Sequence, residues 1–128
     1  MIRISAAVIV DAEGRIPVVR KRGTTAFMQP GGKIDPGETA LAAVRRELVE
    51  EIGVTVAAAD IRPLGRFVAP AANEPDHLVD AELFMVDLRE EPRALAEIDE
   101  IAWVDPAAPG DIELAPLTRQ AVLGLLRS

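Results

Sequence analysis

Residues 32–54 read GKIDPGETALAAVRRELVEEIGV, and this stretch decides the fold. Residues 39–52 hold no proline or glycine and are rich in amino acids that favour helices. Gly53 follows at the place where a left-handed residue caps the end of a helix. The pattern therefore predicts a helix over residues 39–52.

This helix carries acidic side chains along one face. Spacings of three and four residues bring helical side chains together, here Glu47, Glu50 and Glu51. Like charges at such spacings destabilise a helix by about 0.2–0.5 kcal/mol per pair, unless a cation offsets them. Two interpretations are open at this point: a metal-binding cluster, or a solvated acidic face partly neutralised by Arg45 and Arg46. A neighbouring stripe is aliphatic and can pack on a sheet: Leu41, Val44, Leu48 and Ile52.

The order of residues across 32–54 resembles the Nudix box. That family signature is G, five residues, E, seven residues, R-E, an aliphatic, any residue, E-E, any residue, G and an aliphatic. The positions that meet it are Gly32, Glu38, Arg46, Glu47, Leu48, Glu50, Glu51, Gly53 and Val54. The resemblance implies an α+β fold, with an α/β/α sandwich around a mixed β-sheet, and a magnesium- or manganese-dependent hydrolase.

The resemblance also assigns roles within the box. Glu47, Glu50 and Glu51 would bind Mg²⁺ (or Mn²⁺), and Glu47 would also orient or deprotonate the attacking water. Glu38 would assist from the loop, and Arg46 would hold that loop carboxylate. These roles suit the chemistry, because hydrolysis of a phosphoric anhydride needs neutralised oxygens, an aligned water and a base.

Residues before the helix are candidates for substrate binding. Gly31 and Gly32 would let the backbone turn tightly and approach a phosphorylated ligand, although an ordinary turn is the alternative. Phe27 could line a pocket for a nucleobase or simply pack in the core. Basic side chains on the preceding strand could meet phosphates or remain solvated at a strand edge: Arg20, Lys21 and Arg22.

A further carboxylate is expected from outside the box, because members of this family commonly add one as a ligand or base. Glu100, three residues before Trp103, is the first candidate, followed by Glu97 and Glu74. Plain surface exposure is the alternative for each of them.

Composition limits the classes of function. The 128 residues suit one domain, with 49% hydrophobic and 27% charged residues and a formal net charge of −7. This charge disfavours binding to nucleic acid polymers or anionic membranes. There is no cysteine and one histidine, so oxygen atoms would hold any metal ion. The apolar run at residues 6–10 is too short to span a bilayer, and we expect a cytoplasmic protein.

The remaining elements follow from local patterns. Residues 2–10 and 16–22 are predicted to form a hairpin around turn residues 11–14, and PGG at 30–32 a tight loop. Further strands are expected at 64–69, 77–86 and 98–104, and a second helix at 117–126. Together these elements predict a mixed sheet with helices on its faces, in a single domain over residues 1–128.

The expected activity is hydrolysis of the diphosphate linkage in a small nucleoside diphosphate derivative, such as a nucleoside triphosphate or ADP-ribose. Pro70 lies near a proline position of ADP-ribose pyrophosphatases in this family. The alternative is a Nudix-fold domain that binds or senses nucleotides without hydrolysing them. Homodimers are common in the family, and the sequence does not fix the oligomeric state.

Overall fold

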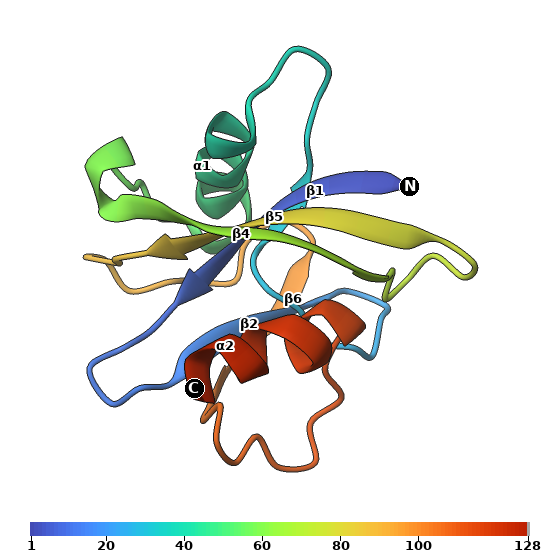
Figure 1. The fold of residues 1–128 in the computed structure, drawn as a ribbon. Coiled ribbons are helices and arrows are strands. Elements are labelled where there is room, and N and C mark those ends of the chain that lie inside the picture. The colour runs from blue at the N-terminus through green and yellow to red at the C-terminus, as the bar shows by residue number, and fades with distance from the viewer. Residues whose placement is uncertain (128) are drawn as a thin grey trace.

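The computed structural model describes residues 1–127, which form strands and helices in a mixed order (Figure 1). The strands are β1 (Ile2–Ile9), β2 (Ile16–Lys21), β3 (Gly31–Lys33), β4 (Ile61–Pro70), β5 (Leu78–Val86) and β6 (Ile98–Val104). The helical elements are α1 (Ala40–Ile52), a 3-10 turn (Ala58–Asp60), a π-helical turn (Thr118–Val122) and α2 (Leu123–Arg127). No helix among the described residues is long and apolar enough to cross a membrane.

Two sheets make up the β structure. The larger sheet has the strand order β3-β1-β5-β4. It is mixed, because β1 and β5 run parallel whereas the other two pairs are antiparallel. The parallel pairing extends from Ile2 opposite Val79 to Ile9 opposite Val86. The smaller sheet pairs β2 with β6 in antiparallel fashion. Figure 1 shows α1 on one side of the four-stranded sheet, and β2, β6 and α2 on the other. This arrangement confirms the α+β fold class.

The predicted hairpin at residues 2–22 is wrong. A turn does form, since the N–H of Asp11 donates to the carbonyl of Arg15 at 2.9 Å, but β1 and β2 do not pair beyond it. Both edges of β1 are occupied by β3 and β5, so β2 leaves the first sheet and pairs with β6. The expected loop at PGG is also partly a strand, because Gly31 and Gly32 pair with Ala6 and Ser5 of β1.

The helix predicted at residues 39–52 is confirmed, and its two ends have the expected caps. The Thr39 hydroxyl accepts a hydrogen bond from the N–H of Ala42 at 3.1 Å, and Gly53 adopts φ 69°. The aliphatic stripe packs against the sheet through Val44, Leu48 and Ile52, all fully buried. This packing turns the acidic stripe toward β3.

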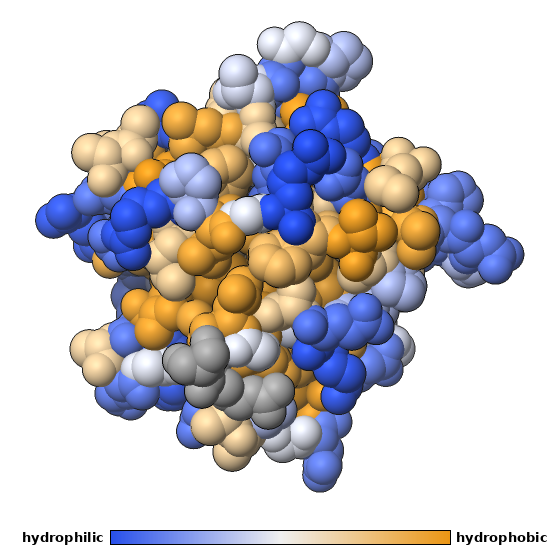
Figure 2. Space-filling view, viewed as in Figure 1, coloured by the Kyte–Doolittle hydropathy of each residue, from blue (hydrophilic) through white to orange (hydrophobic). Residues whose placement is uncertain are grey.

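The other face of the large sheet forms a second core with the C-terminal helix. Ala6, Val8 and Leu83 pack there with Leu117 and Val122. Figure 2, in the same view as Figure 1, shows hydrophobic side chains gathered across the middle of the molecular surface in view, with hydrophilic side chains around them. The candidate site lies where this second core approaches β3.

Candidate functional site

The β3 backbone is in close contact with the acidic face of α1. Gly31 has φ 151°, and a Cβ atom there would overlap the backbone of Ser5 and Ala6. A Cβ atom on Gly32 would lie 2.7–2.9 Å from the carboxylate atoms of Glu47. Glycine at these two positions therefore allows a close fit of β3 against both β1 and the Glu47 carboxylate.

Glu51 is the only charged side chain that is buried among the described residues, at 7% exposure. Its Oε1 accepts a hydrogen bond from the N–H of Gly31 at 3.0 Å. Burial, together with the adjacent Glu47 carboxylate, raises the pKa of Glu51 to about 8, although the Gly31 N–H and Lys21 act to lower it. A buried acid beside a second acid is a costly arrangement that a bound cation would relieve.

Arg46 connects the loop before α1 to the acidic face. Its guanidinium donates two hydrogen bonds to Glu38, at 2.8 and 2.9 Å, one to Glu47 at 2.6 Å and one to the Lys33 carbonyl at 3.1 Å. A longer contact of 3.5 Å reaches Glu50. The Arg46 guanidinium holds the pKa of Glu38 down at about 2, so Glu38 is ionised at neutral pH.

The box acids offer an oxygen donor set, but they do not converge as they stand. No three acidic or histidine side chains among residues 1–127 form a ready metal cluster. Glu47 and Glu51 are neighbours, whereas Glu50 is more exposed and turns to Arg46. Clustered carboxylate oxygens on one helix face suit a hard divalent ion such as Mg²⁺ or Mn²⁺, so the residues present fit the ion that the fold implies.

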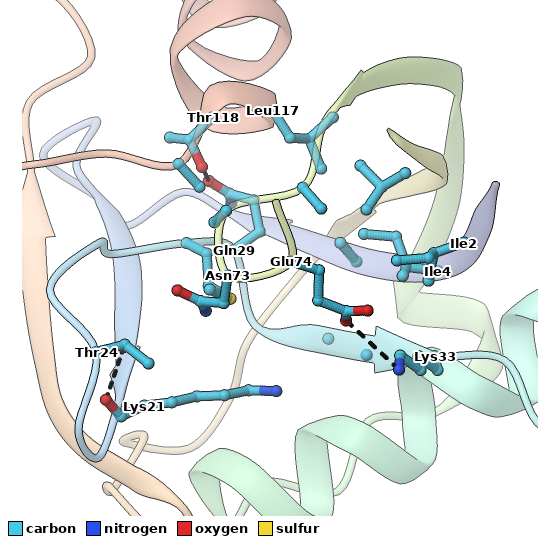
Figure 3. A pocket seen from close by; sticks show the side chains of 18 of the residues that line it. Ile2, Ile4, Lys21, Thr24, Gln29, Lys33, Asn73, Glu74, Leu117 and Thr118 are labelled. Atoms are coloured by element: carbon cyan, nitrogen blue, oxygen red, sulfur yellow. Dashed lines mark hydrogen bonds and ion pairs between the residues drawn. The ribbon is translucent and has the colours of Figure 1, made fainter. Parts of the chain in front are cut away.

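A pocket of about 370 Å³ opens beside these acids. Glu47 and Glu51 do not line the pocket themselves, and they border one end of it through Gly31 and Gly32, which line it and contact Glu51 and Glu47. Figure 3 shows Lys21 and Lys33 toward that end and Thr118 with Leu117 at the opposite end. The pocket therefore has one charged end and one that is mostly apolar.

Lys21, which the sequence analysis named with Arg20 and Arg22 as a possible phosphate contact, lines the pocket. Figure 3 shows its side chain extending along the charged end of the pocket. It is half-buried, it forms no ion pair within the described chain, and its charge acts on Glu51. The run RKR marked the region, but the sequence did not show that Lys21 and Arg22 line the pocket and Arg20 does not.

The two arginines and the phenylalanine selected from the sequence lie in different surroundings. Arg22 lines the pocket, whereas Arg20 donates hydrogen bonds to Asp99 at 2.7 Å and Glu100 at 3.2 Å, and does not line it. Phe27 lies in the second core at 8% exposure, with the Arg20 guanidinium over its ring at 5.8 Å. Of these three residues, only Arg22 is placed to meet a ligand in the pocket.

The sequence analysis ranked Glu100 before Glu97 and Glu74 as a carboxylate from outside the box, and their positions relative to the pocket follow a different order. Glu100 is exposed and paired with Arg20 on the β2–β6 sheet. Glu97 and Glu74 both line the pocket, and Glu74 forms an ion pair of 3.5 Å with Lys33 across the pocket mouth (Figure 3). Glu97 thus has better access to a bound ligand than Glu100 does.

Gly32→Ala is expected to reduce turnover about 100-fold and to leave the protein folded. The added Cβ would displace the Glu47 carboxylate, and misplacing a catalytic group by about 1 Å costs about that factor. Steady-state kinetics and a thermal melt check this result. Gly124→Ala is the matched control, since a Cβ there meets nothing within 4 Å. Equal turnover of both variants would show that the fit of Glu47 against Gly32 has no part in catalysis.

Comparison with known proteins identifies a family and a fold. A family model described as NUDIX domain matches residues 1–123. One relative, an 8-oxo-dGTP diphosphatase of Haemophilus influenzae, is 35% identical over 74 residues, covering 55% of this chain and 54% of the relative. A Bacillus subtilis relative is 26% identical over 107 residues, covering 84% of this chain and 66% of its own length. The matches thus span about half to two thirds of these two relatives.

A solved structure gives the same fold over nearly the whole chain. The MutT NUDIX hydrolase of Burkholderia pseudomallei superposes with a TM-score of 0.79 at 24% identity, over 94% of this chain and 95% of that chain. Similarity at this level of identity shows the fold.

Proposed function

We propose a hydrolytic function for this chain, which belongs to the Nudix hydrolase family because the NUDIX domain model matches residues 1–123. The proposed reaction is cleavage of a diphosphate linkage in a nucleoside triphosphate, with a divalent ion, Mg²⁺ or Mn²⁺, as cofactor. The substrate is a small molecule, and every residue in the proposal comes from one copy of the chain. Cytoplasmic residence stays a prediction.

One observation carries this proposal: the Glu47–Glu51 pair lies against the Gly31–Gly32 backbone at the charged end of a pocket. The pocket offers different surroundings to two parts of a ligand. Its charged end suits phosphates, and its apolar end suits a base. A solvated acidic face would not bury Glu51 to 7% exposure.

The acids of α1 have two tasks in the proposed mechanism. Glu47, Glu50 and Glu51 would hold the ion, which supplies neutralisation of the charge on the phosphate oxygens. Glu47 accepts the proton of the attacking water as the water oxygen bonds to phosphorus. The bridging P–O bond breaks, and the leaving phosphate keeps the electron pair.

Basic side chains position the other participants. Arg46 holds Glu47 at 2.6 Å and Glu38 by two hydrogen bonds, so the base keeps one orientation. Lys21 and Arg22 bind the phosphates as they enter the charged end of the pocket. The backbone of Gly31 and Gly32 lets the substrate approach the acids closely.

We favour a nucleoside triphosphate over ADP-ribose as the substrate, because the Haemophilus influenzae relative is named as an 8-oxo-dGTP diphosphatase. Pro70, the residue that had suggested ADP-ribose, lines the pocket. We therefore keep ADP-ribose as the second candidate in the test.

The test is a panel of substrates with MgCl₂ or MnCl₂: the standard ribo- and deoxyribonucleoside triphosphates, 8-oxo-dGTP and ADP-ribose. Product is read as phosphate, with and without added pyrophosphatase, so that pyrophosphate release is distinguished from phosphate release. We expect turnover of at least one triphosphate, and its loss in EDTA. Nucleotide binding without turnover of any compound, with either metal, would favour the non-hydrolytic alternative.

A further inference from the structure

Two buried polar side chains meet in the wall of the pocket. Gln29, just before the PGG loop, is 4% exposed, and Thr118, in the C-terminal helical segment, is fully buried. The Thr118 hydroxyl donates to Gln29 Oε1 at 3.0 Å, and Gln29 Nε2 donates to the carbonyl of Ala7 at 2.9 Å. Both side chains line the pocket (Figure 3).

These bonds fix the orientation of the Gln29 amide. The Ala7 carbonyl can only accept, so the NH₂ end of the amide must face it, and the oxygen end faces Thr118. One N–H of Gln29 then has no partner among residues 1–127, and the Thr118 oxygen has given its only proton and keeps free lone pairs. The Gln29–Thr118 pair is thus left with one donor and one acceptor.

Apolar side chains make up much of the pocket wall that the Gln29–Thr118 pair shares. Ile2, Ile4, Ala6, Val79 and Leu117 line the same pocket. In Figure 3 Thr118 lies well away from Lys21, at the end opposite the charged one. In an apolar wall, a donor and an acceptor have a large effect on which ligand fits, because a ligand that leaves them unpaired loses binding energy.

The backbone at Thr118 is also unusual. Thr118 is the first residue of the π-helical turn Thr118–Val122, which lies inside the C-terminal helical segment. Single π-helical turns are rare and are found frequently at functional sites. The π-helical turn and the buried hydroxyl therefore mark the same position independently.

We propose that Gln29 and Thr118 determine which nucleobase the pocket accepts. The second N–H of Gln29 donates to an acceptor atom on the base edge, while the fully buried Thr118 acts as a positioning residue that fixes the orientation of the Gln29 amide. This inference rests on the proposed function, since it assumes that phosphates occupy the charged end. A pair that only anchored the C-terminal helix would affect stability and leave base preference unchanged.

The kinetic test compares Thr118→Val, which removes the hydroxyl and keeps the shape, with Thr118→Ser, which keeps the hydroxyl. Val122→Ala is the matched control, because Val122 is fully buried in the same π-helical turn and does not line the pocket. For Thr118→Val we expect kcat/KM of the preferred triphosphate to fall at least about tenfold. The kcat/KM of the triphosphate that is the poorest substrate should change little. Thr118→Ser should restore the preference. Unchanged ratios between triphosphates in Thr118→Val, with a lowered Tm, would overturn the proposal.

A second measurement separates base recognition from hydrolysis. Binding of nucleosides without phosphates is followed by chemical shift changes in NMR titrations of the wild type, Thr118→Val and Val122→Ala. Weaker binding in Thr118→Val alone would support base recognition even if the wild type hydrolysed no nucleotide, in which case only the proposed hydrolysis would fail. No nucleoside binding by the wild type, or equal affinity in Thr118→Val, would overturn the inference whatever the hydrolysis results.

Discussion

Glu47→Gln is expected to lower kcat by about 10²–10⁴-fold, the range attributed to a positioned acid or base, while the protein stays folded. The amide has nearly the shape of the carboxylate, so it can still rest against Gly32 and accept from Arg46. It cannot take a proton from water, and it is a weaker ligand for a divalent ion. Steady-state kinetics on the best substrate of the panel measures this loss.

Two further variants make the Glu47 result specific. Glu50→Gln should lose less activity, because Glu50 is more exposed and only reaches Arg46 at 3.5 Å. Glu82→Gln, on β5 in an exposed ion pair with Arg3, should keep wild-type activity. If Glu47→Gln kept near-normal turnover, Glu47 would be removed from the mechanism.

Glu51→Gln is expected to raise the Tm of the metal-free protein at pH 8 by at least about 4 °C. The folded protein holds the Glu51 proton up to a pKa of about 8, whereas the unfolded chain releases it near 4.5. Between these two pH values the folded state binds the extra proton, so wild-type stability falls as the pH rises and levels off above about 8. Glutamine carries no charge and removes this pH dependence.

Thermal melts in EDTA from pH 5 to pH 8 measure the effect as the difference between the two proteins. The difference in Tm between the wild type and Glu51→Gln should be small at pH 5 and largest at pH 8. The other titrating groups are the same in both proteins, so they do not contribute to it. Millimolar Mg²⁺ or Mn²⁺ should then raise the Tm of the wild type more than that of Glu51→Gln, because the ion binds the native acids. Parallel curves at every pH would mean that Glu51 is not held protonated in the fold.

The sequence was sufficient where structure depends on neighbours along the chain. Helix α1 follows from its run of helix formers, and both caps, Thr39 and Gly53, lie within one turn of its ends. The Arg46–Glu38 contact also joins residues close in sequence. The helix and the position of its acids could therefore be predicted without knowing the rest of the fold.

The pocket could not be predicted in the same way, because the partners of its basic side chains lie far along the chain. Alternation along β2 places Val18 and Arg20 on one face and Val19 and Lys21 on the other. Arg20 pairs with Glu100 across the small sheet, while Lys21 lines the pocket together with Arg22. The sequence does not show which face of β2 meets the pocket, because its partner strand lies about eighty residues away.

The hairpin failed for a related reason. Residues 11–14 have good turn chemistry and do form a turn, but strand pairing depends on competition between edges. Strand β5 pairs with one edge of β1 over its whole length, from Ile2 to Ile9. No local sequence pattern predicts such a parallel partner. The place of Phe27 depends on the same kind of contact, because its bridge partner Leu114 lies far along the chain.

The parallel pairing of β1 with β5 has a consequence for folding kinetics. Strand β1 is synthesised before β5, so it acquires this neighbour only once residues 78–86 exist, and the pocket wall closes only when Thr118 reaches Gln29, 89 residues away in sequence. Contacts of such long range slow the search for the native state. Helix α1, in contrast, can nucleate from its own local contacts. We therefore expect the acids of the candidate site to gather on α1 before the chain has built the pocket beside them.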